Sequence, residues 1–351
     1  GPAAGAFRVF RPESVTNGAL RVAFAADETV TDTASNGVDY VFDTDFTADL
    51  TIMEEAHELI ERITKAEKPL PMFTSCCPGW IKHVEHNYPE MIPHISSCKS
   101  PQQMMGALIK SYFAEQEGID PNDIYVISVM PCTAKKYEAK RPEMGKNGIQ
   151  DVDAVLTTRE IAGLIDQFGI EFARLPEGEF DQVIGQTSGS GDVFAASGGV
   201  MESAIRTAYN MLTGAHMEDI DFTKVRGFEG IKEAEVTIGG NTIKVAVVNT
   251  LGKAGEFIEH LDEHLSEYAF IEVMACPGGC VGGGGQIYGY DSDRVKERIK
   301  AVYDVEKTRK VRRSYQSERI QDLYSNFLEH PGSERGHTLL HTTYYERAVR
   351  R

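Results

Sequence analysis

Apolar residues follow two spacings along this chain, and together they predict alternating helices and strands. In residues 49–63 they recur every three or four positions, the period of a helix with one buried face. The same spacing predicts helices at residues 101–112, 201–212 and 253–265. Short apolar and β-branched runs predict strands at residues 71–74, 124–129, 243–248 and 270–274.

The order of these elements predicts an α/β fold. A helix separates the strands at 243–248 and 270–274, and such a unit joins parallel neighbours in a sheet. The chain has 351 residues, enough for a well-buried core in two lobes or two domains. Apolar residues near helical spacing beyond residue 313 predict a tail that wraps the outside.

Five of the six cysteines lie directly after predicted strands. They are Cys76 and Cys77 after the first strand, Cys132 after the second, and Cys276 and Cys280 after the last. Sites in α/β folds lie at the carboxyl ends of strands, so thiols that are far apart in sequence should converge on one point.

Composition excludes several classes of partner. Lys+Arg number 36 and Asp+Glu 53, a formal charge of −17 that opposes binding to nucleic acid or to an anionic membrane. No stretch approaches the roughly 18 apolar residues of a membrane span, and no signal-peptide pattern is found. We expect a cytoplasmic protein, or one of an organellar stroma if a transit peptide has been removed.

The number and spacing of the cysteines favour metal binding over disulfides. Six cysteines are too few to staple this chain, and the vicinal pair Cys76 and Cys77 is a poor candidate for a bridge. Structural zinc usually draws on two close pairs, whereas only Cys276 and Cys280 form one here. Four thiolates from distant segments better suit a cubane iron–sulfur cluster, with nearby glycines letting backbone N–H groups approach the sulfurs.

At these residues the sequence resembles the iron-only (FeFe) hydrogenases. All three signature motifs of that family occur in order, at residues 74–80, 130–135 and 272–280. The likeness runs from about Phe42 to the C-terminus. It implies two α/β lobes with mostly parallel sheets flanked by helices, and a cofactor in the cleft between them. It also implies one catalytic domain over 1–351, with 314–351 as a helical tail like the family's small subunit.

The resemblance implies an H-cluster, a 4Fe-4S cubane joined to a two-iron subcluster that carries CO, cyanide and azadithiolate ligands. Carried over position by position, the cubane ligands would be Cys77, Cys132, Cys276 and Cys280. Cys280 would also bridge to the two-iron subcluster, which dedicated maturases install. The implied reaction is the reversible conversion of two protons and two electrons into H₂.

A proton path and a pocket wall also follow from the resemblance. Cys76 would exchange protons with the azadithiolate amine, and Glu55, Ser96 and Glu58 would continue the path to solvent, with a water between Cys76 and Glu55. Lys135 would hydrogen-bond a cyanide, because a buried ammonium needs an anionic partner. The other pocket residues would be Met130, Met274, Gln102, Ala25 and Phe194.

Without the resemblance, these residues would have ordinary roles. Glu55 and Glu58 flank a helical stripe and would be surface carboxylates, while Lys135 would be exposed. Cys98 would be a buried, inert thiol. The ten histidines show no ligand-like clustering, so none is given a role.

The sequence departs from the family near its N-terminus. Residues 23–27 read Ala-Phe-Ala-Ala-Asp where the family has Ala-Pro-(Ser/Ala)-Val-Arg. No ferredoxin-like Cys-x2-Cys-x2-Cys repeats precede the motifs, so electrons would enter the cubane directly from a ferredoxin or flavodoxin. The basic run at 307–313 is a candidate docking patch, although on charge alone such a run is a solvated face.

Two other functions fit the same fold. One is an iron–sulfur assembly factor with the cubane alone, and the other is a redox or hydrogen sensor. Assembly relatives typically lose residues around the second iron pair, whereas Cys76, Met130, Lys135 and Met274 are all present here. Sensory relatives tend to change the first cysteine of the vicinal pair and to carry signalling domains. The sequence therefore favours the enzyme.

Overall fold

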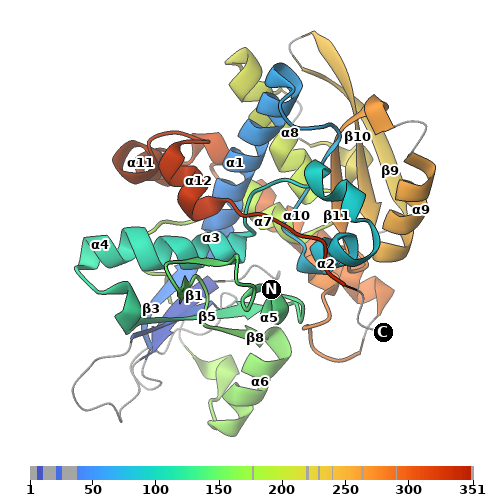
Figure 1. The fold of residues 1–351 in the computed structure, drawn as a ribbon. Coiled ribbons are helices and arrows are strands. Elements are labelled where there is room, and N and C mark those ends of the chain that lie inside the picture. The colour runs from blue at the N-terminus through green and yellow to red at the C-terminus, as the bar shows by residue number, and fades with distance from the viewer. Residues whose placement is uncertain are drawn as a thin grey trace.

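The computed structural model describes most of the chain. It covers residues 6–10, 21–25, 38–175, 178–218, 221–227, 230–238, 240–261, 265–289 and 291–348. Two principal β-sheets with helices around them form its two halves (Figure 1). This arrangement confirms the predicted α/β fold.

The first sheet has the strand order β1-β3-β2-β5-β8. Its strands are β1 (Ala6–Phe10), β2 (Arg21–Ala25), β3 (Val38–Asp43), β5 (Ile124–Met130) and β8 (Ala154–Thr157). Neighbours among β3, β2, β5 and β8 are parallel, and β1 is antiparallel to β3. The strand predicted at 124–129 is β5.

The second sheet has the order β4-β11-β10-β9. Its strands are β4 (Met72–Phe73), β9 (Ile231–Ile238), β10 (Asn241–Asn249) and β11 (Tyr268–Met274). β4, β11 and β10 are parallel and β9 is antiparallel, with α9 (Leu251–Leu261) connecting β10 to β11. All seven residues of β11 are buried, as expected for an inner strand of a parallel sheet.

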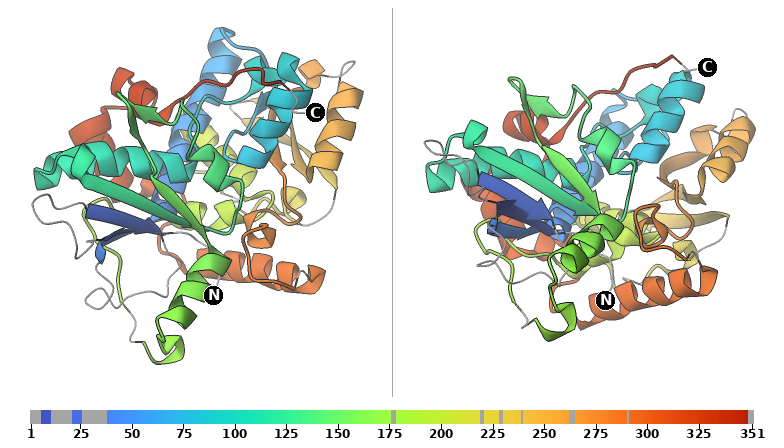
Figure 2. Two further views of the ribbon diagram at one scale, coloured as in Figure 1. Left: turned by 60° about the horizontal axis from the view of Figure 1, so that its bottom comes forward. Right: turned by 90° about the horizontal axis from the view of Figure 1, so that it is seen from below.

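Helices pack around both sheets. Besides α9 they are α1 (Thr44–Lys65), α2 (Pro78–Asn87), α3 (Pro101–Leu108), α4 (Ala114–Glu117), α5 (Lys135–Glu138), α6 (Thr158–Gln167), α7 (Gly189–Asp192), α8 (Gly199–Thr213), α10 (Ser292–Thr308), α11 (Glu318–Leu323) and α12 (Glu334–Leu340). Figure 2 shows α10 along the outside of the molecule, beside the loop that follows β11. Within the described ranges, no helix has both the length and the apolar character to cross a membrane.

Helix α1 lies at the centre, between α3 and α8 (Figure 1). Asp43 is the N-cap of this helix, and its carboxylate accepts the N–H of Asp45 at 3.0 Å, so the helix starts earlier than the apolar spacing predicts. Its polar face is buried as well as its apolar face, because other helices cover both. The expectation that Glu55 and Glu58 would by themselves be surface carboxylates is therefore wrong.

The C-terminal tail packs onto this framework. Its apolar residues Ile320, Leu323 and Phe327 are buried in the core beside the first sheet. The segment after α12 then runs across the molecule to α2 (Figure 1), where the Nε of Arg347 donates to Glu85 at 3.0 Å. The tail thus joins both halves of the molecule.

Candidate functional site

The loops that follow β4, β5 and β11 meet in one cavity. Its wall includes Cys76 and Cys77 after β4, Cys132 after β5, and Cys276 and Cys280 after β11. The cavity measures about 780 Å³ with its open mouth included. Because β5 belongs to the first sheet and β4 and β11 to the second, the cavity receives thiols from both halves, and the expected convergence is observed.

Local structure fixes two of the cysteine loops. Cys77 is the N-cap of α2 and Pro78 is the first residue of that helix, so the start of the helix fixes the position of Cys77 at the cavity. Asn249, at the end of β10, donates to the carbonyl of Cys276 and accepts the N–H of Gly278, both at 3.2 Å. The sequence carries no signal for Asn249, because an asparagine at the end of a strand usually marks only a turn.

Glycines in the last loop allow close packing. A Cβ on Gly283 would lie 2.0 Å from the carbonyl oxygen of Pro131, and one on Gly279 would lie 2.7 Å from the backbone nitrogen of Ser197. Gly279 also has a φ of +95°, which glycine adopts readily. Gly283 therefore lets the loop after β11 pack against the loop after β5, and Gly279 lets it pack against Ser197, a role beyond the predicted approach of N–H groups to sulfur.

The donor set suits a metal cluster. Burial raises the pKa of Cys132 to about 12 and, with the nearby Cys132 and Cys77, holds the pKa of Cys280 well above its usual range. A bound metal cation reverses this preference for the protonated thiol, because a thiol that coordinates a metal is deprotonated. Four such sulfurs around one cavity supply a complete set of soft ligands.

The spacing of these sulfurs argues against a single zinc ion. Ligand atoms around tetrahedral zinc lie about 4 Å apart or less. Across the described residues, the one group of three potential ligands within 4.8 Å of one another is Glu58, Cys98 and His341. The four cysteines are thus spread more widely, as the corners of a larger inorganic core require.

Lys135 lies in the cavity wall and is buried, so the expectation that it would by itself be exposed is wrong. Its Nζ donates to the carbonyl of Cys76 at 3.0 Å and to both carboxylate oxygens of Glu138, at 3.1 and 3.0 Å. Burial lowers the pKa of this ammonium, but the charge of Glu138 outweighs burial and the pKa is raised. Lys135 therefore presents a fixed positive charge to the cavity.

Glu138 is a site residue that the sequence did not reveal. Its Oε2 accepts hydrogen bonds from Ser100 Oγ at 2.9 Å and from Gln102 Nε2 at 3.1 Å. Ser128 Oγ in turn donates to Gln102 Oε1 at 2.7 Å. The spacing of three residues from Lys135 on a helix was the available signal.

Cys76 and Glu55 form the side of the cavity that faces α1. Cys76 is almost fully buried, and burial together with the charge of Glu55 raises the pKa of its thiol well above the usual range. Glu55 is completely buried. Burial raises its pKa to about 8 and outweighs the interactions with Ser96 and with the backbone N–H of Ser75, which lower the pKa, so Glu55 is protonated at neutral pH.

Glu58 lies one helical turn further along α1. Its Oε2 accepts from Ser96 Oγ at 3.3 Å and from the N–H and Oγ of Ser97 at 2.8 and 2.9 Å. Its Oε1 accepts from Arg62 at 2.7 Å and from the half-exposed Lys68 at 2.9 Å. Burial raises the pKa of Glu58, but the two cations outweigh it and lower the pKa to about 2.

The remaining predicted residues are placed as follows. Met130 ends β5 and Met274 ends β11, and both line the cavity together with Gln102 and Phe194. Ala25 ends β2, and its side chain lies outside what the structure describes.

Family comparisons agree with this geometry. The family model described as "Iron only hydrogenase large subunit, C-terminal domain" matches residues 12–284, and the one described as "Iron hydrogenase small subunit" matches residues 292–347. The NADP-reducing hydrogenase subunit HndD of Solidesulfovibrio fructosivorans is 47% identical over 317 residues, which cover 89% of this chain. That match covers 54% of HndD, so the chain spans about half of that relative's length.

Two further comparisons bear on the fold and on the alternatives. A solved structure of HydA1 from Chlamydomonas reinhardtii, the apo form of a single-residue variant, is 42% identical, with a TM-score of 0.79 over 89% of this chain and 86% of that one. The cytosolic Fe-S cluster assembly factor narfl of Xenopus tropicalis is 34% identical over 88% of this chain and 67% of its own length. By fold, motifs and family match, this chain belongs to the iron-only hydrogenases.

Proposed function

We propose that this chain is a hydrogenase that interconverts two protons and two electrons with H₂ at an H-cluster in the cavity. The observation that carries the proposal is the fifth thiol. A cubane needs four cysteines, yet Cys76 adds a buried thiol and Lys135 a buried cation to the same wall. A site for the cubane alone needs neither group.

Four residues would hold the cubane: Cys77, Cys132, Cys276 and Cys280. The H-cluster, when bound, would supply the electrons and the iron at which hydrogen is formed or split. The ammonium of Lys135 would bind an anionic ligand of that cluster, since Glu138 fixes it at the wall. Met130 and Met274 would exclude water with polarizable side chains.

A proton would leave the cavity by way of α1. Glu55, which is protonated at neutral pH, would release its own proton toward Ser96 and then take the proton of the Cys76 thiol, because its pKa of about 8 lies close to neutrality. Ser96 lies next and donates to Glu58, whose other oxygen reaches the half-exposed Lys68. Glu58 stays ionised through its two cations, so it orients the serines at the outer end of the path.

We propose a ferredoxin or flavodoxin as the electron carrier. Of the basic run at 307–313, three arginines make internal contacts: Arg309 with Asp192, Arg312 with Glu306, and Arg313 with the carbonyl of Met217. Lys307 and Lys310 remain exposed. The candidate docking patch is thus smaller than the sequence indicated.

An iron–sulfur assembly factor is the second candidate, because such relatives match most of the chain at 34% identity or less. The cavity-lining Cys76, Met130, Lys135 and Met274 favour the hydrogenase, since a cubane alone requires none of these side chains. The higher identity to hydrogenases, at 46–47%, points the same way.

Hydrogen evolution after loading tests the proposal. The protein would first receive the cubane and then the two-iron subcluster from its maturases, and H₂ would be measured with reduced methyl viologen. The proposal expects turnover only after the second step. Four irons per chain and no H₂ after complete maturation would instead support the assembly factor.

A further inference from the structure

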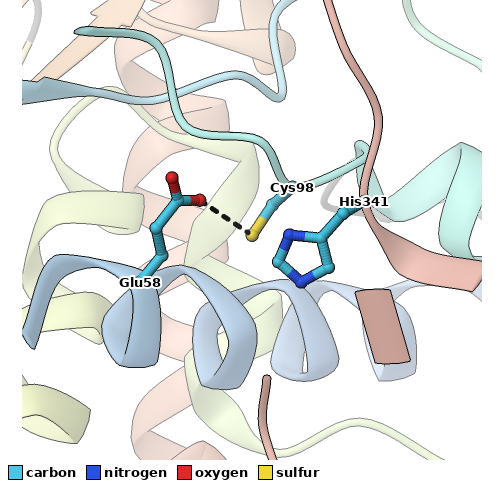
Figure 3. A group of neighbouring side chains, drawn as sticks. All are labelled: Glu58, Cys98 and His341. Carbon is cyan, nitrogen blue, oxygen red and sulfur yellow. Dashed lines mark hydrogen bonds between the residues drawn. The ribbon is translucent and has the colours of Figure 1, made fainter. Parts of the chain in front are cut away.

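Glu58, Cys98 and His341 form a cluster beside the proposed proton path (Figure 3). One potential ligand atom from each lies within 4.8 Å of those of the other two, and Cys98 Sγ is 4.0 Å from Glu58 Oε2. They come from α1, the loop before α3 and the end of α12. The sequence predicted no role for any histidine. It hides this cluster because 243 positions separate His341 from Cys98.

The histidine is oriented as metal ligands commonly are. His341 Nε2 lies 3.1 Å from Glu54 Oε2, and Glu54 is itself held by Tyr324 at 2.6 Å and by the N–H of Gly332 at 2.9 Å. A carboxylate that accepts Nε2–H leaves the lone pair on Nδ1. That Nδ1 faces Ser97 Oγ at 2.9 Å, toward Glu58.

The hydroxyl of Ser97, which also accepts from Lys68 at 3.3 Å, can donate to only one of its two acceptor neighbours when His341 is neutral. Its Oγ is 2.9 Å from Glu58 Oε2 and 2.9 Å from His341 Nδ1. When the histidine is neutral, both atoms are acceptors and the hydroxyl has one proton. A cation at this point would satisfy both lone pairs at once.

Charge around Glu58 is divided between its two oxygens. Arg62 and Lys68 bind Oε1, whereas Oε2 faces the serines and Cys98. Oε2 is therefore able to bind a metal while Oε1 keeps its cations. Glu54 adds a carboxylate on the far side of His341, and its negative charge would offset part of the positive charge of a bound metal ion.

We propose that Glu58, Cys98 and His341 form a binding site for Zn²⁺, with Ser97 Oγ or water as the fourth ligand. Zinc bonds of about 2.0–2.3 Å need only a small inward shift of the three side chains. On binding, zinc exchanges bound waters for bonds to the sulfur of Cys98, to Nδ1 of His341 and to Oε2 of Glu58, and the thiol proton of Cys98 and any proton on Nδ1 are released to solvent. No oxidant or reductant is needed.

The functional consequence rests on the proposed function. Zinc would fix Glu58 and end the hydrogen bond that the Ser97 hydroxyl donates to it at the outer end of the proton path. We therefore expect zinc to inhibit hydrogen turnover with methyl viologen, a carrier that supplies electrons without using this path.

The test uses the fully loaded protein, so that the cluster cysteines are already occupied. After addition of zinc and removal of the excess, X-ray absorption at the zinc edge is expected to show one sulfur neighbour and at least one imidazole. Cys98→Ala is expected to lose the sulfur neighbour, and both Cys98→Ala and His341→Gln are expected to weaken zinc binding at least about tenfold. Cys98→Ser keeps the volume of the side chain and serves if the alanine variant is unstable.

His337→Gln is the matched control, because its ring lies 4.2 Å from that of His341 but His337 is outside the cluster. It is expected to bind zinc as the unchanged protein does. The site is wrong if excess zinc leaves no bound ion, if the zinc has no sulfur neighbour, or if Cys98→Ala binds equally well.

The two proposals can fail separately. Zinc bound through Cys98 and His341 in a protein without hydrogen turnover would overturn the proposed function and keep the site. Zinc bound in this way to an active enzyme whose rate does not change would overturn the inhibitory role.

Discussion

Cys76 and Cys77 are adjacent in the sequence but lie in different surroundings. Cys77 is the N-cap of α2, whereas Cys76 is buried, and burial raises the pKa of its thiol well above the usual range. The family resemblance implies that Cys76 is the thiol of the pair that binds no iron. The sequence could not reveal that Glu55 is completely buried with a pKa raised to about 8, since its burial depends on helices packed around α1.

Removing the free thiol tests its assigned role. Cys76→Ala is expected to lower hydrogen turnover by about 100- to 10,000-fold, the usual contribution of one proton-transfer group. Iron content and the infrared spectrum of the loaded protein should not change, because Cys76 is not among the four proposed ligands. Wild-type turnover in this variant would exclude Cys76 from the proton route.

The ionisation of Glu55 is a second prediction. Burial raises its pKa to about 8, so an infrared band from a protonated carboxyl group is expected below that pH and should disappear as pH rises through it. Its stabilising contribution is complete below the unfolded pKa of about 4.5 and is lost as pH rises toward 8 and beyond.

A pair of variants assigns this band. Glu55→Gln should remove it, whereas Glu58→Gln should leave it, because Arg62 and Lys68 lower the pKa of Glu58 to about 2. Loss of the band in Glu58→Gln alone would show that the two carboxyl groups have the opposite ionisation.

At the scale of elements, apolar runs located the strands whose ends build the site. The strand predicted at 124–129 is β5 and the βαβ unit is β10-α9-β11, so the sequence placed three cysteine loops correctly. Pro78 also begins α2 as predicted. Helix boundaries were less accurate: α1 starts at Thr44 because Asp43 caps it, a contact that apolar spacing does not record.

The close packing of the loops after β5 and β11 leads to a prediction about iron binding. Gly283→Ala is expected to move the loops after β5 and β11 apart, since its Cβ would lie 2.0 Å from the Pro131 carbonyl, and so to reduce bound iron per chain. Gly284→Ala is the matched control, because the nearest atom to its Cβ is Thr133 Oγ1 at 3.5 Å. Equal iron content in both variants would contradict the packing role.

At the scale of the whole molecule, the long-range contacts were beyond the sequence. Glu58 and His341 belong to opposite ends of the chain, and the pairing of Arg347 with Glu85 joins the tail to α2. Such contacts depend on how two sheets and a tail pack, for which a single sequence carries no periodic signal. The family resemblance supplied the cluster ligands, while the structure supplied Glu138, Asn249 and the histidine cluster.

The exposed lysines at the end of α10 and just beyond it are the basis of a prediction on electron delivery. Reversing Lys307 and Lys310 to Glu is expected to raise the KM for reduced ferredoxin several-fold and to leave the KM for methyl viologen unchanged, because a small dye needs no charged docking face. Reversing Lys296 and Lys300, two exposed lysines within α10, is the control. A similar effect of both pairs, or of either pair on both carriers, would rule out a specific patch.

Infrared spectroscopy of the matured protein tests the central claim most directly, because few other groups absorb where metal-bound CO and cyanide do. The claim is that four cysteines hold a cubane while Cys76 and Lys135 face a second iron unit. We expect bands from both ligands after maturation, and the cyanide bands should shift in Lys135→Met, which removes the ammonium from the cavity wall. A protein that takes up four irons but shows no CO or cyanide bands would contradict the account.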